Sequence, residues 1–329
     1  GSERRTTTTR SACGVGCEGR VDRPAGGPGG RRYVDSRFAV PRHDNHPMDL
    51  WTAPVLDVRS LLSREREELL SFVGSLTDDE WTSPTSVPGW TVKDLALHVL
   101  DDDLGWLSRG RDGDRSGRLD VEDADFVDAL DRKNQRWVDG AAQLSRRVVL
   151  DLLEWAGQQM DSYYASQSLT APGHVTWASH GPVPTWFDLA QDLTERWVHQ
   201  MQMREAVDHV AAFRAAYLPV VMQTMVWAFP HQYRAAASAG TSVLLDLGAG
   251  GRWTLTSDGV RWHLDPGADD GAHVAEVHAA DDAGWRWLTG GAPPAAAIVT
   301  SGPQELVEPL LQVRAALVRR PDRASRIGP

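Results

Sequence analysis

Cysteine is almost absent from this chain of 329 residues. Its two cysteines, Cys13 and Cys17, lie near the N-terminus, and none follows them. From residue 18 onward the chain therefore contains no disulfide, no thiolate metal site and no cysteine nucleophile. The spacing of the two cysteines does not by itself indicate a zinc site, because no second pair follows.

Long apolar runs and clusters of basic residues are also missing. No apolar run reaches the roughly 18 to 20 residues that a membrane span needs, and the N-terminus lacks the apolar segment of a secretory signal. The formal net charge is -11, and Lys and Arg do not cluster as they do on nucleic-acid-binding surfaces. We therefore expect a cytoplasmic protein whose partners are neither membranes nor nucleic acids.

The first 47 residues differ in composition from the rest of the chain. They are rich in Arg, Thr, Gly and Pro and show no hydrophobic periodicity, so we expect a disordered tail over residues 1–47. The chain length favours two further domains. We place them at residues 48–239 and 240–321, with a short C-terminal tail over residues 322–329.

Apolar residues between positions 48 and 239 recur at helical spacing. We expect helices over residues 57–76, 92–107, 121–159 with a break near Gly140, 185–207, and 218–239 with a kink at Pro230. Because four of these helices are long, the pattern favours a four-helix bundle. Residues 170–184 are expected to form a loop, which contains His174 and His180.

Two of these helices carry a predicted N-terminal signal. Thr91 and Thr185 each precede an aspartate by three residues, Asp94 and Asp188. A Thr followed by an acidic residue at this offset is typical of a capping box. We therefore expect Thr91 and Thr185 to be N-cap residues.

The pattern changes at Gly240. The segments TSVLLDLG, RWTLTSD, GVRWHLD and AHVAEVHA are short, rich in Val, Leu, Thr and Trp, and separated by glycine-containing turns. They predict strands. DDAGWRWLTG and PQELVEPLLQVRAALV predict a short helix and a closing helix. The predicted fold class is therefore α plus α+β: a helical bundle followed by a small α+β domain.

One pair of residues could bind a metal ion. Glu195 and His199 are four residues apart, so they project from the same face of the predicted helix. His98, on the helix that follows Thr91, would complete a set of two histidines and one carboxylate. The alternatives are a polar pair on a wet face, with Arg196 and Arg204 beside it, and a histidine packed in the core. Spacing alone leaves these alternatives open.

Other residues near His98 are open to two interpretations. Asp101, Asp102 and Asp103 are expected to form a solvated helix face, although Asp102, four residues after His98, could support that ring. Trp81, Trp90 and Trp106 flank the same segment. They could pack the core or form the wall of a substrate pocket.

Two segments resemble the mycothiol-dependent maleylpyruvate isomerase family: LTDDEWTSPTSVPGWTVKDLALHVL and ERWVHQMQMREAV. The resemblance covers about residues 57–320. It implies a DinB-like four-helix bundle, a carrier-protein-like C-terminal domain, and a divalent metal, most often zinc, held by His98, Glu195 and His199. It also implies mycothiol as a cosubstrate. The acidic run after His98 and the segment from the 140s to the 180s do not match the pattern of the family.

The scarcity of cysteine suggests how such a site would work. A free thiol has a pKa near 8.5 and reacts as the thiolate, which a bound zinc ion stabilises. We therefore expect a thiol-dependent isomerase or S-transferase acting on a small electrophile, with no catalytic side chain assigned and the oligomeric state open. The alternatives are a non-catalytic module of the DinB-like superfamily that binds a metal and a small molecule, and a structural bundle without metal.

Overall fold

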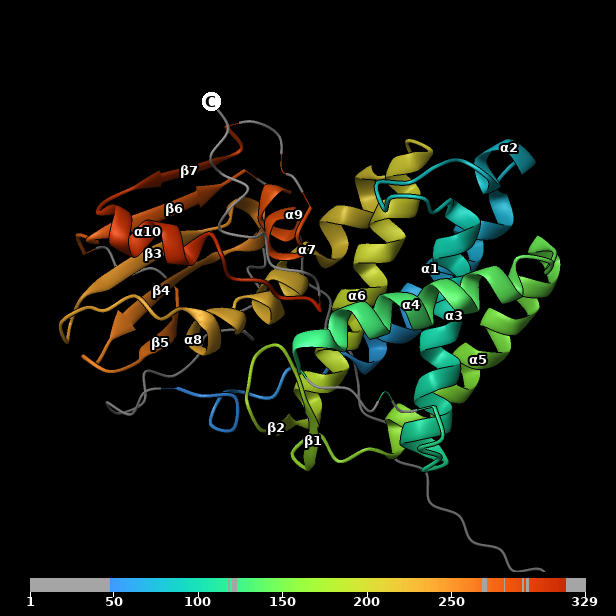
Figure 1. Ribbon diagram of the computed structural model, residues 1–329, viewed down its shortest axis with the longest axis horizontal. Helices are drawn as coiled ribbons and strands as arrows, with labels where there is room; N and C mark the ends of the chain where they lie inside the picture. The colour runs from blue at the N-terminus through green and yellow to red at the C-terminus, as the bar shows by residue number, and fades with distance from the viewer. Residues whose placement is uncertain are drawn as a thin grey trace, which may run out of the picture. The chain divides into compact units, whose positions relative to one another are not determined.

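The computed structural model describes residues 48–117, 119, 123–267, 271–280, 282–291, 293 and 296–317 (Figure 1). The predicted N-terminal tail with Cys13 and Cys17, and the predicted C-terminal tail, lie outside the described residues. No described helix is both long and apolar enough to cross a membrane. The described chain contains a helical part, which comes first, and a part built on a β-sheet.

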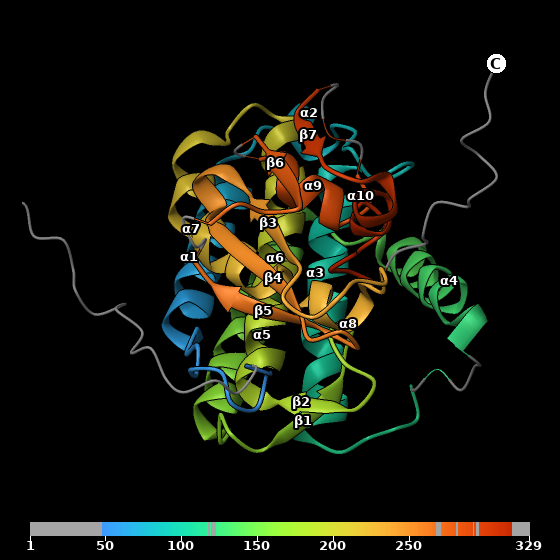
Figure 2. The same ribbon diagram turned by 90° about the vertical axis from the view of Figure 1, so that its left-hand side faces the viewer.

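The helical part contains eight α-helices among the described residues. They are α1 (Arg59–Ser75), α2 (Asp78–Trp81), α3 (Val92–Trp106), α4 (Asp123–Ala141), α5 (Arg146–Ser166), α6 (Thr185–Ala206), α7 (Ala211–Met225) and α8 (Ala228–Gln232). A π-helical turn, η2 (Leu107–Arg111), continues α3. Helices α1 and α3 each pack against α5 and α6, and α4 packs on α3 (Figures 1 and 2).

The start of α3 follows the capping prediction. The Thr91 hydroxyl accepts a hydrogen bond from the Asp94 backbone N–H, and the Asp94 carboxylate accepts one from the Thr91 N–H. This reciprocal pair satisfies two backbone donors that the first helical turn leaves free. Leu95, Leu97 and Leu100 are fully buried in the core that α3 shares with α1 and α5.

The cap predicted at Thr185 is wrong. Pro184 occupies the N-cap position of α6, and Thr185 is the first helical residue. The Thr185 hydroxyl donates instead to the carbonyl of Ala171. The expected loop over residues 170–184 contains a short hairpin, β1 (Pro172–Val175) paired with β2 (Pro182–Pro184), which packs against α6. The tertiary contact to the hairpin replaces the local cap.

Two other helices differ in extent from the expectation. The expected helix over residues 121–159 is two helices, α4 and α5, and Ser145 caps the second through its hydroxyl. The expected helix over residues 218–239 begins earlier, is divided between α7 and α8, and ends at Gln232. After α8, Tyr233 is extended and buried, and its hydroxyl donates to the carbonyl of Leu306.

The sheet has five strands in the order β5-β4-β3-β6-β7. Their bounds are β3 (Ser242–Asp246), β4 (Arg252–Ser257), β5 (Trp262–Pro266), β6 (Ala275–Ala279) and β7 (Ile298–Ser301). β3 pairs parallel with β6, and the other pairs are antiparallel. α9 (Ala283–Leu288) follows β6, and α10 (Gln304–Leu310) ends earlier than the expected closing helix. The sequence pattern missed β7.

Buried side chains connect the two parts. The Trp197 ring on α6 meets the Trp285 ring on α9 edge to face, with centroids 5.6 Å apart. Arg286 forms an ion pair with Glu205 at the end of α6. One buried apolar cluster includes residues from α6, α7 and the sheet. The described helices and the sheet therefore share a core, and the domain boundary at residue 240 stays a prediction.

Candidate metal centre and adjoining pocket

The three residues singled out as metal ligands lie together where α3 contacts α6. His98, Glu195 and His199 each offer one ligand atom, and these atoms all lie within 4.8 Å of one another. No other group of three or more His, Cys, Asp or Glu side chains with this potential occurs among the described residues. Two segments that are about a hundred residues apart in the chain therefore converge on one small volume.

Each histidine has one ring nitrogen beside a polar side chain one turn away. The His98 Nε2 atom lies 3.5 Å from the Asp102 Oδ2 atom. The His199 Nδ1 atom lies 2.9 Å from the Gln202 Oε1 atom. The two rings meet edge to face with centroids 4.7 Å apart. Such partners fix ring orientation and leave the second nitrogen of each ring for a ligand.

The second nitrogen of His98 has no partner among the described residues. His98 is buried, and its Nδ1 atom forms no hydrogen bond there. A buried polar atom without a partner costs free energy, so such atoms are rare unless something binds them. This orphaned nitrogen, together with His199 and Glu195, gives the nitrogen and oxygen donors that zinc and similar divalent ions accept. The residues present therefore fit a divalent metal ion.

Protonation of the two histidines also suits a metal site. Desolvation lowers the pKa of His98, partly offset by the negative charge of Glu195. Desolvation, and then the charge of His98, lower the pKa of His199 to about 3. Both rings are therefore neutral at neutral pH, which is the form that coordinates a metal.

Glu195 has the opposite shift. Desolvation, and then the charge of Asp102, raise the pKa of Glu195 to about 8. The Glu195 side chain is solvent-exposed, and water weakens both the desolvation and the repulsion by Asp102. Without a cation, the protonated carboxyl is therefore more favoured than in a free glutamate. A bound cation would favour the ionised form.

The acidic run after His98 is not a solvated face, contrary to the expectation. Asp103 is fully buried, where it binds Arg66 at 2.6 Å and Arg196 at 2.5 Å. Asp101 forms a 2.6 Å ion pair with Lys133 of α4. The spacing could not show this, because the cations come from distant segments.

Arg196 is likewise buried rather than part of a wet face. Besides Asp103, it binds Asp192 one turn earlier on α6, with Nε 2.9 Å from Oδ2. The Tyr164 hydroxyl of α5 also contacts Asp192. The network joins α3, α5 and α6 directly beside Glu195. It therefore holds the helices that carry the candidate ligands, and sequence reasoning missed it.

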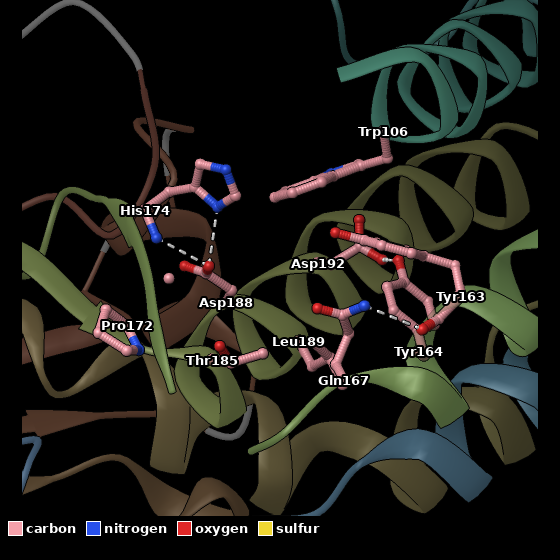
Figure 3. Close-up of a pocket in the computed structure, with 11 residues that line it drawn as sticks. Trp106, Tyr163, Tyr164, Gln167, Pro172, His174, Thr185, Asp188, Leu189 and Asp192 are labelled. Atoms are coloured by element: carbon pink, nitrogen blue, oxygen red, sulfur yellow. Dashed lines mark hydrogen bonds and ion pairs between the residues drawn. The ribbon is translucent and has the colours of Figure 1, made fainter. Parts of the chain in front are cut away.

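A pocket lies near this network (Figure 3). Aromatic and polar side chains from α3, α5, α6 and the β1–β2 hairpin line it. The lining residues are Trp106, Tyr163, Tyr164, Gln167, Pro172, Gly173, His174, Thr185, Asp188, Leu189 and Asp192. The sequence analysis left a pocket wall open for Trp106. It expected Thr185 and Asp188 only to cap the helix and His174 only to lie in a loop, and it assigned no pocket role to the other lining residues.

The pocket continues the same helical faces that carry the candidate ligands. On α6, Asp188 and Asp192 precede Glu195 by seven and three residues, so the three side chains lie along one face. On α3, Trp106 follows His98 by eight residues, or about two turns. With a rise of about 1.5 Å per residue, Asp188 lies about 10 Å from Glu195 along the helix axis. A small molecule could therefore extend from the pocket toward the candidate metal centre.

The pocket also contains a histidine–aspartate pair. The Asp188 Oδ2 atom lies 2.9 Å from both the backbone nitrogen and the Nδ1 atom of His174. The His174 ring meets the Trp106 ring edge to face, with centroids 4.9 Å apart. Figure 3 shows the two rings side by side, with Asp188 below His174. Because an ionised carboxylate only accepts hydrogen bonds, Nδ1 carries the proton and Nε2 stays available.

A family model matches the segment that carries both motifs. Residues 62–204 match the model described as the mycothiol maleylpyruvate isomerase N-terminal domain. Residues 62–204 belong to this family. The match contains His98, Glu195 and His199 as well as all residues that line the pocket, and it ends before the sheet begins.

A comparison with solved structures found two structures of an isomerase of that name. A crystal structure of the mycothiol-dependent maleylpyruvate isomerase has 17% sequence identity and a TM-score of 0.46. The match covers 77% of this chain and 95% of that one. A mutant of that isomerase has the same identity and coverage, with a TM-score of 0.45. No curated protein matched the sequence.

Proposed function

We propose that this protein is a metal-dependent enzyme that uses a low-molecular-weight thiol, mycothiol, to isomerise or S-conjugate a small electrophile. The observation that carries the proposal is the convergence of His98, Glu195 and His199, from two separate motifs, within 4.8 Å. The family of residues 62–204 supports mycothiol as the thiol. We further propose that α1, α3, α5 and α6 form a DinB-like four-helix bundle, and that residues 240–321 form a separate domain.

The chemistry divides between the metal and the chain. A bound divalent cation, with zinc as the proposed ion, would lower the pKa of a thiol at its open position and so supply the thiolate. The chain holds His98 and His199 neutral and orients their rings through Asp102 and Gln202. The described residues contain no cysteine, so the sulfur nucleophile must come from the thiol.

Metal analysis tests the proposed ligands. We expect about one equivalent of a divalent metal per chain in the purified protein, and loss of that metal in His98→Ala and His199→Ala. His263→Ala is the matched control, because His263 lies on β5 of the sheet. Wild-type protein without metal, or full metal content in His98→Ala, would refute the proposed site.

Turnover tests the thiol. The metal-loaded protein is mixed with mycothiol and a panel of small electrophiles, and adducts or isomers are detected by mass spectrometry. We expect product only when both mycothiol and metal are present. Turnover without thiol contradicts the mechanism, whereas metal binding without any reaction across the panel favours the non-catalytic binding module.

A further inference from the structure

The pocket beside the candidate metal centre has a charge that restricts its ligand. Two carboxylates line it, those of Asp188 and Asp192, and no lysine or arginine is among its lining residues. Arg196, the cation that contacts Asp192, is buried and also binds Asp103. Sites that bind carboxylates or phosphates normally present arginine or lysine to them. Here an anionic group would meet the carboxylates of Asp188 and Asp192, which are already paired with His174 and Arg196, and the lining offers it no lysine or arginine.

The remaining lining favours a flat, uncharged molecule. Trp106 and Tyr163 offer aromatic faces that pack against planar groups. The donors of Gln167 and Thr185 are already bonded within the protein, whereas the side-chain oxygens of both residues can still accept hydrogen bonds. Figure 3 shows these polar groups around the same hollow as the rings of Trp106 and His174. The aromatic lining, which includes no lysine or arginine, therefore suits a flat, uncharged carbonyl compound better than a dicarboxylate.

His174 is placed to exchange a proton with such a ligand. Asp188 holds its Nδ1 atom at 2.9 Å, so the ring is oriented and its Nε2 atom faces away from the carboxylate. The side chain is 60% exposed, so the ring is accessible, unlike that of the buried His98. A histidine whose ring is oriented by a carboxylate in this way has the geometry that general acid–base catalysis uses.

We propose that this pocket binds the electrophile that accepts the thiol. The electrophile is an uncharged, flat compound with a carbon–carbon double bond conjugated to a carbonyl group. His174 exchanges a proton with its carbonyl oxygen. This inference rests on the proposed function, and it names the substrate class and a catalytic residue of that site. Asp188 is a positioning residue, because it acts through His174.

The chemical step balances without any oxidant or reductant. The thiolate sulfur forms a bond to the alkene carbon remote from the carbonyl. The π electron pair of the alkene forms a new double bond to the carbonyl carbon, and the π pair of the carbonyl group moves onto its oxygen. The proton on Nε2 of protonated His174 moves to that oxygen, which leaves a neutral imidazole and an enol. The former alkene bond is now single and can rotate. His174 then takes the proton back from the enol oxygen, the carbonyl and the alkene re-form, and the carbon–sulfur bond breaks to release the thiolate and an isomerised alkene.

Binding of unreactive probes tests the substrate class without turnover. The metal-loaded full chain is titrated calorimetrically with 4-nitrobenzamide, 4-nitrobenzoate and 4-nitrobenzylammonium, which share one flat ring and differ in charge. We expect the amide to bind at least tenfold more tightly than either ion. Trp106→Leu should weaken amide binding at least tenfold, whereas Trp155→Leu, at an exposed position on α5, should not.

Several outcomes would overturn the substrate class. They are benzoate or benzylammonium binding as tightly as the amide, no binding of the amide, and amide binding that is unaffected by Trp106→Leu. These binding measurements need neither thiol nor turnover. Loss of the charge preference with intact thiol-dependent turnover therefore rejects this inference alone. The reverse result, with the preference present and no thiol-dependent turnover, rejects the proposed function and the role of His174 while the pocket assignment stands.

The role of His174 is tested by separating binding from turnover. The reaction is mycothiol with the neutral enone 4-phenyl-3-buten-2-one, at saturating concentrations. We expect His174→Gln to lower kcat by about 100-fold, in the range typical of a lost general acid, while the Kd of 4-nitrobenzamide changes less than threefold. His263→Gln is the matched control, because the Nε2 atom of His263 lies 2.8 Å from Asp258 on the β4–β5 hairpin. An unchanged kcat in His174→Gln, or parallel losses of probe binding and kcat, would contradict a proton-transfer role.

Discussion

A Cβ atom on Gly173 would lie 2.1 Å from the Oδ2 atom of Asp188. That oxygen is the one that holds the backbone and the ring of His174. Asp188 is buried and has little room to move. The absence of a side chain at position 173 is therefore what allows the carboxylate to reach the hairpin.

Gly173→Ala should for this reason destabilise the protein and separate Asp188 from His174. We expect a loss of about 1–3 kcal/mol in the free energy of unfolding, which is typical of overpacking a buried site. Urea denaturation measures it. Gly181→Ala, in the same hairpin, is the control, because a Cβ there meets nothing within 4 Å. Equal stability of the two variants would show that the Asp188 carboxylate can move aside at little cost in free energy.

Metal binding should release a proton from Glu195. Its pKa of about 8 in the metal-free protein means that the carboxyl is mostly protonated at pH 6 and mostly ionised at pH 9. Because the ion binds the carboxylate, affinity should fall about tenfold per pH unit below pH 8. Calorimetric titration in buffers of different ionisation enthalpy counts the protons. We expect about one at pH 6 and far fewer at pH 9, and a loss of this proton in Glu195→Gln. Constant affinity from pH 6 to pH 8 would contradict the shift.

Removal of the buried cation Arg196 should be strongly destabilising. Arg196→Met leaves Asp103 and Asp192 in the core with one cationic partner fewer, and breaking a buried pair in this way typically costs about 3–5 kcal/mol. Chemical denaturation at neutral pH measures the change. Arg64→Met is the control, since Arg64 pairs with Glu68 on an exposed face and should matter little. A difference below about 1 kcal/mol between the two variants would show that the network adds little stability.

The N-cap of α3 should contribute both to stability and to the metal site. Thr91→Ala removes the hydroxyl that accepts from Asp94, at a typical cost of about 1 kcal/mol. Because His98 lies two turns into the same helix, we also expect weaker metal binding in this variant. Thr91→Ser retains the acceptor and should restore both properties. If serine and alanine behave alike, the capping bond is not the cause.

The sequence predicted those features that depend on neighbours along the chain. The Thr91–Asp94 cap, the extent of α1 and α6, and four of the five strands of the sheet all follow from local spacing. The candidate ligands also came from spacing, because Glu195 and His199 are four residues apart and the segment after Thr91 offers His98. Their proximity is now a geometric fact, whereas their role as ligands stays a prediction.

Features that depend on distant partners were missed. Asp188 has the sequence signature of a capping residue, yet its partner is His174, fourteen residues earlier on a hairpin that local propensity does not predict. Asp103 looked exposed because only its aspartate neighbours were visible, and its cations come from positions 66 and 196. A Gly-His pair in the connection that leads to a helix with an early aspartate is the signal that could have indicated the pocket.

The β1–β2 hairpin has a consequence for engineering. It supplies His174 from the connection between α5 and α6, whereas the candidate ligands stand on α3 and α6 themselves. The hairpin therefore forms one wall of the pocket, whereas α3, α5 and α6 form the rest. If the pocket binds the acceptor as proposed, exchanging residues 168–184 for a connection of different composition would change that wall and the choice of acceptor, while the helices that would hold the metal keep their sequence.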